Sequence, residues 1–134
     1  MGQPAAKQGD KIIAAADIHI VMVPAPPGPP VPTPLPHPFT GILDGGLSSD
    51  VKIMGMAAAT VNSTATNTPS HIPTPPGVSF QVPPENKGTI MMGSMTVKIN
   101  GKAAARNGDP ARTCGTPPNM GAQVVAVGTV MIGG

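Results

Sequence analysis

The residues in this chain best suited to bind a metal ion are three histidines and its single cysteine: His19, His37, His71 and Cys114. One thiolate and three imidazoles form a complete tetrahedral ligand set for zinc, and a site closed by four protein ligands is structural because no position stays open for catalysis. Their separations match no sequence-local zinc motif, so each residue also has an ordinary interpretation. His19 could be a strand residue facing water, and Cys114 a small buried apolar group.

Catalysis by the same side chains is the less favoured interpretation. A hydrolase needs a nucleophile, a base and an oxyanion site, and Cys114 with one histidine is the only plausible dyad. No acid or amide is evidently placed to orient that base. The sequence contains no GxSxG, Walker or HExxH motif. We therefore expect a protein that is not an enzyme, and a Cys-His hydrolase is the weakest alternative.

The composition predicts strands around a thin hydrophobic core. Isoleucine and valine far outnumber leucine, and β-branched residues favour a pleated surface. The only aromatic residues are Phe39 and Phe80, so the side chains that bury most area are nearly absent. Such a core needs a staple or a partner surface, and a structural metal would contribute folding free energy.

Charge and hydropathy exclude several classes of protein. The formal net charge is +2, and the basic residues are scattered along the chain rather than gathered in a stripe. Without such a stripe or aromatic rings that stack on bases, we expect no nucleic-acid binding. No apolar run is long enough to span a membrane. The first ten residues lack the hydrophobic segment of a secretory signal, so we expect synthesis in the cytoplasm without a signal peptide. A single cysteine excludes an intrachain disulfide framework.

The pattern predicts one all-β domain over residues 1–134. Strands are expected over 11–23, 78–82 and 123–132, and Asn100-Gly101 predicts a type I′ hairpin because both residues tolerate positive φ. Loops are expected over 62–76 and 115–121. Residues 24–38 are more than half proline, which predicts a stiff polyproline II loop rather than a strand because donors are missing. That segment could alternatively be a ligand for an aromatic-lined groove on another protein.

The chain contains internal copies of one strand unit. Residues 51–60 match residues 97–106 at seven of ten positions. Ala5-Ala6-Lys7-Gln8-Gly9-Asp10 repeats Ala104-Ala105-Arg106-Asn107-Gly108-Asp109, whereas the copy that ends at Ser63 lacks the Gly-Asp ending. The copies overlap without one fixed period, which indicates internal pseudo-symmetry and not a solenoid.

These repeats resemble the PAAR-repeat family, and more closely its PAAR-like branch. The ordered set Pro36-His37-Pro38-Phe39, Ser70-His71-Ile72-Pro73, Gly88-Thr89-Ile90, Val97–Lys102 and Thr113-Cys114 extends the resemblance over nearly the whole chain. The resemblance implies a small cone of short antiparallel strands in three pseudo-symmetric sheets. It also implies a structural metal, usually zinc, held near the apex by His19, His37, His71 and Cys114.

The function that the resemblance implies is mechanical. Such a protein caps and sharpens the trimeric β-helical spike of a contractile, phage-tail-like injection apparatus, either a type VI secretion system or an extracellular injection particle. We expect one tip chain per trimer, transient contact with a target membrane, and possible attachment of effector cargo. The particle would deliver the chain outside the cell or into a target cell. The alternative is a zinc-stabilised adaptor that recruits partners through its proline segment.

Overall fold

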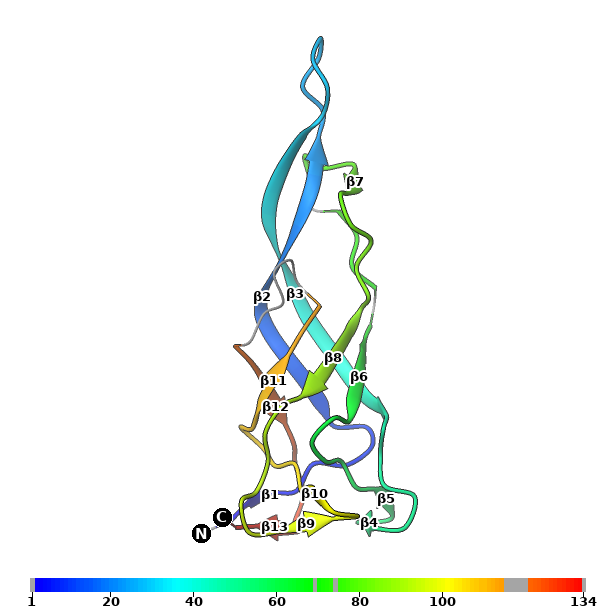
Figure 1. Cartoon of the computed structure of the whole chain (residues 1–134), viewed down its shortest axis with the longest axis vertical. Helices are drawn as coiled ribbons and strands as arrows, with labels where there is room; N and C mark the ends of the chain where they lie inside the picture. The colour runs from blue at the N-terminus through cyan, green and yellow to red at the C-terminus, as the bar shows by residue number, and fades with distance from the viewer. Residues whose placement is uncertain (1, 69, 74, 115–120, 134) are drawn as a thin grey trace.

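The computed structural model shows a tapered all-β body that is wide at one end and ends in a narrow hairpin at the other (Figure 1). The structure describes residues 2–68, 70–73, 75–114 and 121–133. These residues include no helix long and apolar enough to cross a membrane. The predicted all-β conical fold is confirmed. The loop predicted over 115–121 lies, apart from Gly121, outside the described residues.

Two long strands dominate a set of short ones. The strands are β1 (Gln3–Pro4), β2 (Lys11–Val23), β3 (Val31–Gly45), β4 (Lys52–Ile53), β5 (Met56–Ala57), β6 (Thr64–Asn67), β7 (Ser79–Phe80), β8 (Lys87–Ile90), β9 (Lys98–Ile99), β10 (Lys102–Ala103), β11 (Pro110–Arg112), β12 (Ala122–Val125) and β13 (Met131–Ile132). β2 matches the strand predicted over 11–23, and β9–β10 is the hairpin predicted at Asn100-Gly101, where φ is 52° and 81°. β6 lies inside the segment predicted as loop, because Ala65 and Asn67 alternate inward there.

Six antiparallel strands close into a small barrel in the order β2-β3-β6-β8-β11-β12, and β12 pairs back with β2. Closure leaves no free sheet edge around the barrel wall. β7 adds to β2 further towards the narrow end. Small side chains fill the barrel around one aromatic ring, Phe39, as the composition predicted. The core is therefore thin.

A β-bulge in β2 determines which side chains face inward. Pairing with β3 shifts by one residue between Ala14 and Asp17. Before the shift the buried positions are Ile12 and Ala14; after it they are Asp17, His19 and Val21. An extra residue in one strand reverses the alternation of its side chains. The bulge thus turns the polar side chains of β2 into the interior.

The predicted polyproline loop over residues 24–38 is wrong for its second half. Residues 31–38 belong to β3 and pair with β2, so that only residues 24–30 form the turn at the narrow end (Figure 1). Pro32, Pro34 and Pro36 alternate with residues that have a backbone N–H to donate. Period-two spacing places every missing N–H on the edge away from β2, where it costs no ladder hydrogen bond. The adaptor alternative therefore loses most of its free polyproline segment.

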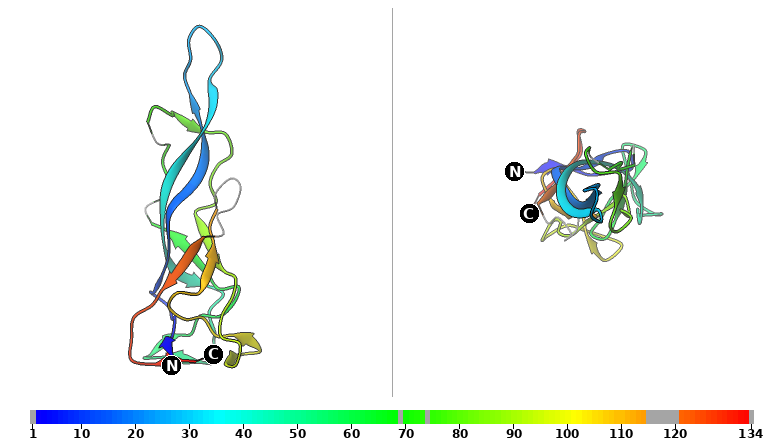
Figure 2. Two further views of the ribbon diagram at one scale, coloured as in Figure 1. Left: turned by 90° about the vertical axis from the view of Figure 1, so that its left-hand side faces the viewer. Right: turned by 90° about the horizontal axis from the view of Figure 1, so that it is seen from above.

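Three two-stranded hairpins surround the wide end, which we call the base. They are β4–β5, β9–β10 and β13–β1, each with two residue pairs. In the first two, a two-residue turn joins the strands; in the third, no turn joins β1 to β13, because the two strands are far apart in the sequence. Seen along the axis, these hairpins point to different sides (Figure 2). One isoleucine from each hairpin is buried beneath it: Ile53, Ile99 and Ile132.

A closed ring of hydrogen bonds links the three repeats just inside the base. Ala6 donates its N–H to the carbonyl of Ala105 at 2.9 Å, Ala105 donates to Ala59 at 3.0 Å, and Ala59 donates to Ala6 at 3.0 Å. All three alanines are fully buried. The flanking β-bridges repeat the same cycle: Lys7 with Ala58, Thr60 with Ala104, and Arg106 with Ala5. One chain thus builds a threefold arrangement from three different segments.

The second repeat forms the same backbone turn as the first and third, although it lacks their Gly-Asp ending. In the first and third repeats, the carboxylates of Asp10 and Asp109 accept the N–H three residues earlier, at 3.1 and 2.7 Å. In the second, Ser63 Oγ accepts the N–H of Thr60 at 2.9 Å. Asn62 has a φ of 76° where the other repeats have glycine. A hydroxyl and an asparagine therefore replace the aspartate and glycine of the turn.

Candidate metal centre

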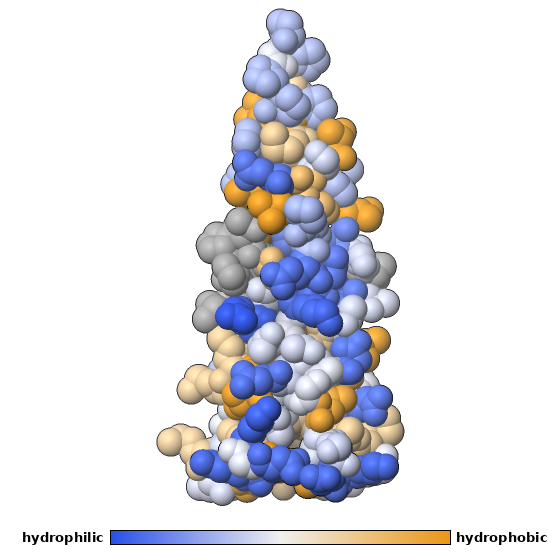
Figure 3. Space-filling model, turned by 45° about the vertical axis from the view of Figure 1, so that its right-hand side comes forward, coloured by the Kyte–Doolittle hydropathy of each residue, from blue (hydrophilic) through white to orange (hydrophobic). Residues whose placement is uncertain are grey.

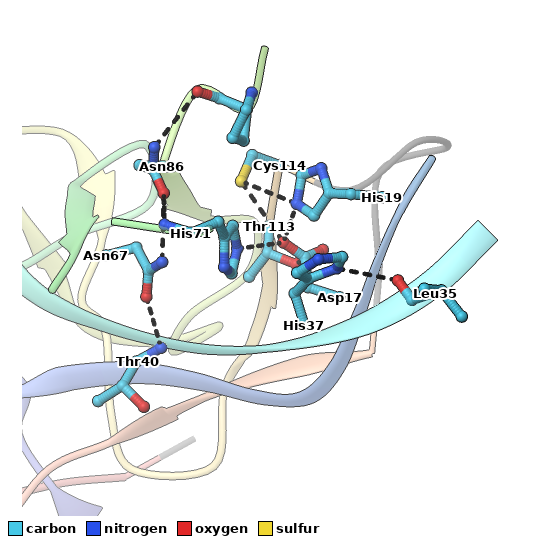
Figure 4. Close-up of polar contacts among 11 residues, drawn as sticks. Asp17, His19, Leu35, His37, Thr40, Asn67, His71, Asn86, Thr113 and Cys114 are labelled. Carbon is cyan, nitrogen blue, oxygen red and sulfur yellow. Dashed lines mark hydrogen bonds and ion pairs between the residues drawn. The ribbon is translucent and has the colours of Figure 1, made fainter. Parts of the chain in front are cut away.

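Four segments that are distant in sequence bring the predicted ligands together above the barrel (Figure 4). His19 lies on β2, His37 on β3, His71 between β6 and β7, and Cys114 just after β11. The three imidazole ring centroids are 4.7–5.5 Å apart. Cys114 Sγ is 3.7 Å from His19 Nε2. The four candidates therefore share one site.

A carboxylate that the sequence did not single out lies among them. Asp17 Oδ2 is 3.1 Å from His19 Nε2, 3.3 Å from His71 Nε2 and 3.4 Å from Cys114 Sγ. Asp17 is fully buried, and its other oxygen accepts a hydrogen bond from the Thr113 hydroxyl at 2.7 Å. Ligand atoms of Asp17, His19, His71 and Cys114 all lie within 4.8 Å of one another. This is a cluster of donors able to hold a metal ion.

The donor separations fit a small tetrahedral ion. Bonds of about 2.0–2.3 Å to N, O and S place neighbouring ligand atoms of a tetrahedron about 3.3–3.6 Å apart. Four of the six separations among these ligand atoms, 3.1, 3.3, 3.4 and 3.7 Å, lie close to that range, and all six are within 4.8 Å. A thiolate with two imidazoles selects borderline-soft metals over Mg²⁺ or Ca²⁺. Both the chemistry and the spacing of these residues therefore suit zinc.

His37 stands slightly apart from this set. Its Nδ1 is 2.9 Å from the carbonyl of Leu35, and a further hydrogen bond joins the ring to the backbone of Asp17. Its ring also packs against Phe80, with centroids 5.3 Å apart. The prediction that His37 is a ligand stays a prediction. The structure adds Asp17 as a second candidate for the fourth ligand.

Burial and hydrogen bonding shift the protonation of the site in defined directions. Burial lowers the pKa of His71 and of His37, so both imidazoles are held neutral, which is the form that binds metal. Burial acts to raise the pKa of Asp17, but hydrogen bonds from His19 and Thr113 outweigh it and lower that pKa below its ordinary value. Burial, followed by the Asp17 charge, raises the pKa of Cys114 to about 11.

Zinc affinity is expected to rise about tenfold per pH unit between about pH 7.5 and 9, because binding must displace the one proton of the Cys114 thiol. With its pKa at about 11, that thiol keeps its proton throughout this range. Competition titration against a chelator of known proton affinity measures the slope. Cys114→Asp is the control, since its carboxylate is already ionised and should flatten the slope. An equal slope in both proteins would contradict the assignment.

An amide relay positions His71. The Thr40 N–H donates to Asn67 Oδ1 at 3.0 Å, the Asn67 amide donates to Asn86 Oδ1 at 3.2 Å, and the His71 N–H donates to that same oxygen at 2.8 Å. These bonds tie the loop that carries His71 to β3 and β6. Such outer contacts fix the orientation of metal-binding side chains. Neither asparagine was predicted to have a role.

Two further residues of the site lie beside predicted ligands in the sequence. Asp17 precedes His19 by two positions in a predicted strand, so both side chains had to face the same way. Thr113 adjoins Cys114. No pattern marked Asn67 or Asn86, because their roles depend on contacts between segments that are far apart in the sequence.

The site does not have the geometry of a cysteine hydrolase. Asp17 and Cys114 both approach the same nitrogen, His19 Nε2, whereas a catalytic triad needs the acid and the nucleophile on opposite ring nitrogens. A thiol with a pKa of about 11 is also a poor source of thiolate. The arrangement is better suited to gripping an ion than to attacking a substrate.

The family assignment agrees with this geometry. The PAAR motif model matches residues 34–118, more than half of the chain, and that range includes His37, His71 and Cys114. The chain belongs to the PAAR motif family. PAAR proteins are structural spike-tip proteins of contractile injection systems. No curated protein matches this chain.

Proposed function

We propose that this PAAR chain caps the trimeric β-helical spike of a contractile, phage-tail-like injection machine, of the type VI secretion or extracellular class, and sharpens it for membrane puncture. The observation that carries this proposal is the closed ring of Ala6, Ala59 and Ala105. A monomer that sits on a threefold stalk must present three equivalent surfaces, and the ring supplies them from one polypeptide. One tip chain would then serve each trimer.

The base has the surface that such a partner would cover. Exposed methionines and valines gather on and beside its hairpins: Met54, Met56, Met95, Val97, Val127, Val130 and Met131. An apolar set of this size on a small chain marks an interaction site. Methionine adapts its shape to a facing surface, which suits contact with three chains at once. The short hairpins also offer strand edges for pairing.

The metal centre would act as a staple near the narrow end. We propose that His19, His71 and Cys114 hold zinc together with a fourth ligand, and that the ion ties β2, the segment after β11 and the loop before β7 into one unit. Bound zinc supplies folding free energy that the thin core lacks. Four protein ligands leave no open position, so its role is structural. The assembled tip would leave the cell with the particle.

The proposed seating predicts that one charge at the base abolishes spike binding. Met56 on β5 and Ile42 on the barrel wall are each 39% exposed, which makes them a matched pair. Met56→Glu would bury a carboxylate against the spike and weaken binding at least about a hundredfold, whereas Ile42→Glu should bind like the unmodified chain. Biolayer interferometry with a trimeric spike protein measures both. Equal loss in the two variants would overturn the seating on the base.

A further inference from the structure

Among the described residues, the strands of the narrow half of the cone carry no exposed formal charge. Residues 18–43 and 53–84 contain no Asp, Glu, Lys or Arg. These segments include β7 and all of β2 and β3 beyond the metal centre. The nearest carboxylate, Asp17, is fully buried. Pale and orange atoms prevail at the narrow end, with one deep-blue group among them, and deep blue becomes frequent from the middle of the cone to the base (Figure 3).

The outer edge of β3 in this half lacks backbone donors over residues 31–38, where a strand edge would normally expose them. Over residues 31–38, β3 pairs with β2 on one side, and its pairing with β6 begins only at Gly41. Pro32, Pro34, Pro36 and Pro38 occupy alternate positions on the other edge. An ordinary strand would present unpaired N–H groups there, each costly to move out of water. The prolines remove them.

Branched aliphatic side chains project from this surface on more than one segment. Val31 at the start of β3 is 50% exposed, and Val78 and Val82, on either side of β7, are 66% and 55% exposed. The hydrogen bond from the Val78 N–H to the Met22 carbonyl places Val78 level with the upper part of β2. Apolar groups therefore surround the narrow end without any neighbouring charge.

We propose that the narrow end partitions into the lipid of a neutral bilayer. Charge and unpaired backbone N–H groups are both costly to move into hydrocarbon. Residues 18–43 and 53–84 carry no formal charge, and the outer edge of β3 presents no N–H over residues 31–38. A surface that binds a protein partner usually carries Tyr, Trp or Arg side chains as anchors. The segments 18–43 and 53–84 contain none of these three residue types. The inference rests on the proposed function only for the direction of movement, in which the narrow end of the cone meets the membrane first.

A single tryptophan tests the proposal, because the chain contains neither Trp nor Tyr. Val31→Trp reports on the narrow end, and Met131→Trp, at a base position with similar exposure of 57%, is its matched control. Vesicles of phosphatidylcholine brominated on the acyl chain quench any tryptophan that enters the lipid. We expect blue-shifted emission and at least threefold stronger quenching for Val31→Trp, unchanged by salt. Equal quenching, no quenching, or binding only to anionic vesicles would overturn the proposal.

A second pair of variants, made in the Val31→Trp background, separates this inference from spike capping. Val78→Lys places a charge beside β7 and should lower vesicle partitioning about tenfold, whereas Val78→Leu should preserve it. Spike binding should be the same in both. Met56→Glu should do the reverse, losing the spike while keeping partitioning. If Val78→Lys partitions as well as Val78→Leu, the lipid contact is wrong even where spike binding stands.

Discussion

Chelating the bound ion is expected to lower the free energy of unfolding by about 4 kcal/mol when free zinc is a thousandfold above its dissociation constant. For a chain of 134 residues this corresponds to a drop in melting temperature of about 15 °C. The reason is that the ion would join β2, the loop before β7 and the segment after β11, which are far apart in the sequence. Thermal unfolding followed by circular dichroism, with and without chelator, measures the difference.

Substitutions of the ligands extend this prediction. Cys114→Ala should remove both the metal and the stability it provides, since the thiolate bonds directly to the ion. Asp17→Asn and His37→Asn distinguish the fourth ligand: the separations around Asp17 Oδ2 predict that Asp17→Asn loses zinc and His37→Asn keeps it. Elemental analysis of each purified variant gives the answer. The opposite result would make His37 the fourth ligand, and one equivalent of zinc in Cys114→Ala would contradict the site.

Enlarging a side chain in the alanine ring is the second change with a large expected effect. Ala59→Leu should destabilise the protein by about 3 kcal/mol, because three added carbons must enter a core where Ala59 is fully buried. The backbone there cannot retreat without breaking the hydrogen bonds to Ala6 and Ala105. Chemical denaturation measures the loss.

A neighbouring position provides the control for this prediction. Ala57, Ala103 and Pro4 occupy corresponding places in the three repeats, since each carbonyl accepts the N–H at the equivalent position of another repeat. Proline already fills that place in one repeat, and Ala57 is only half-buried. Ala57→Leu should therefore change stability by less than about 1 kcal/mol. If Ala59→Leu changed stability as little as Ala57→Leu, the alanine ring would not be a packed threefold core.

The sequence was most informative where chemistry is local. Asn100-Gly101 predicted its hairpin because positive φ is a property of those two residues. The alternation over 11–23 predicted β2, but it could not say which face is buried, since the bulge before Asp17 reverses the alternation and depends on pairing with β3. The same reversal hid the role of Asp17.

Two further differences arise from relations between segments. The prolines of β3 looked incompatible with a strand when counted, yet their spacing places every missing donor on one edge. Ser63 looked like a broken repeat, although a hydroxyl there accepts the same backbone N–H as the aspartates do. Residue type alone fails in both cases because geometry decides which donors and acceptors must be present.

The central claim is that one chain supplies a threefold surface, through the ring of Ala6, Ala59 and Ala105, and so caps three chains of a spike. Native mass spectrometry of the complex formed with a trimeric spike protein tests it most directly. We expect a single complex with one tip chain for every three spike chains, whatever the excess of tip. Three tip chains on a trimer, or no complex at all, would contradict it.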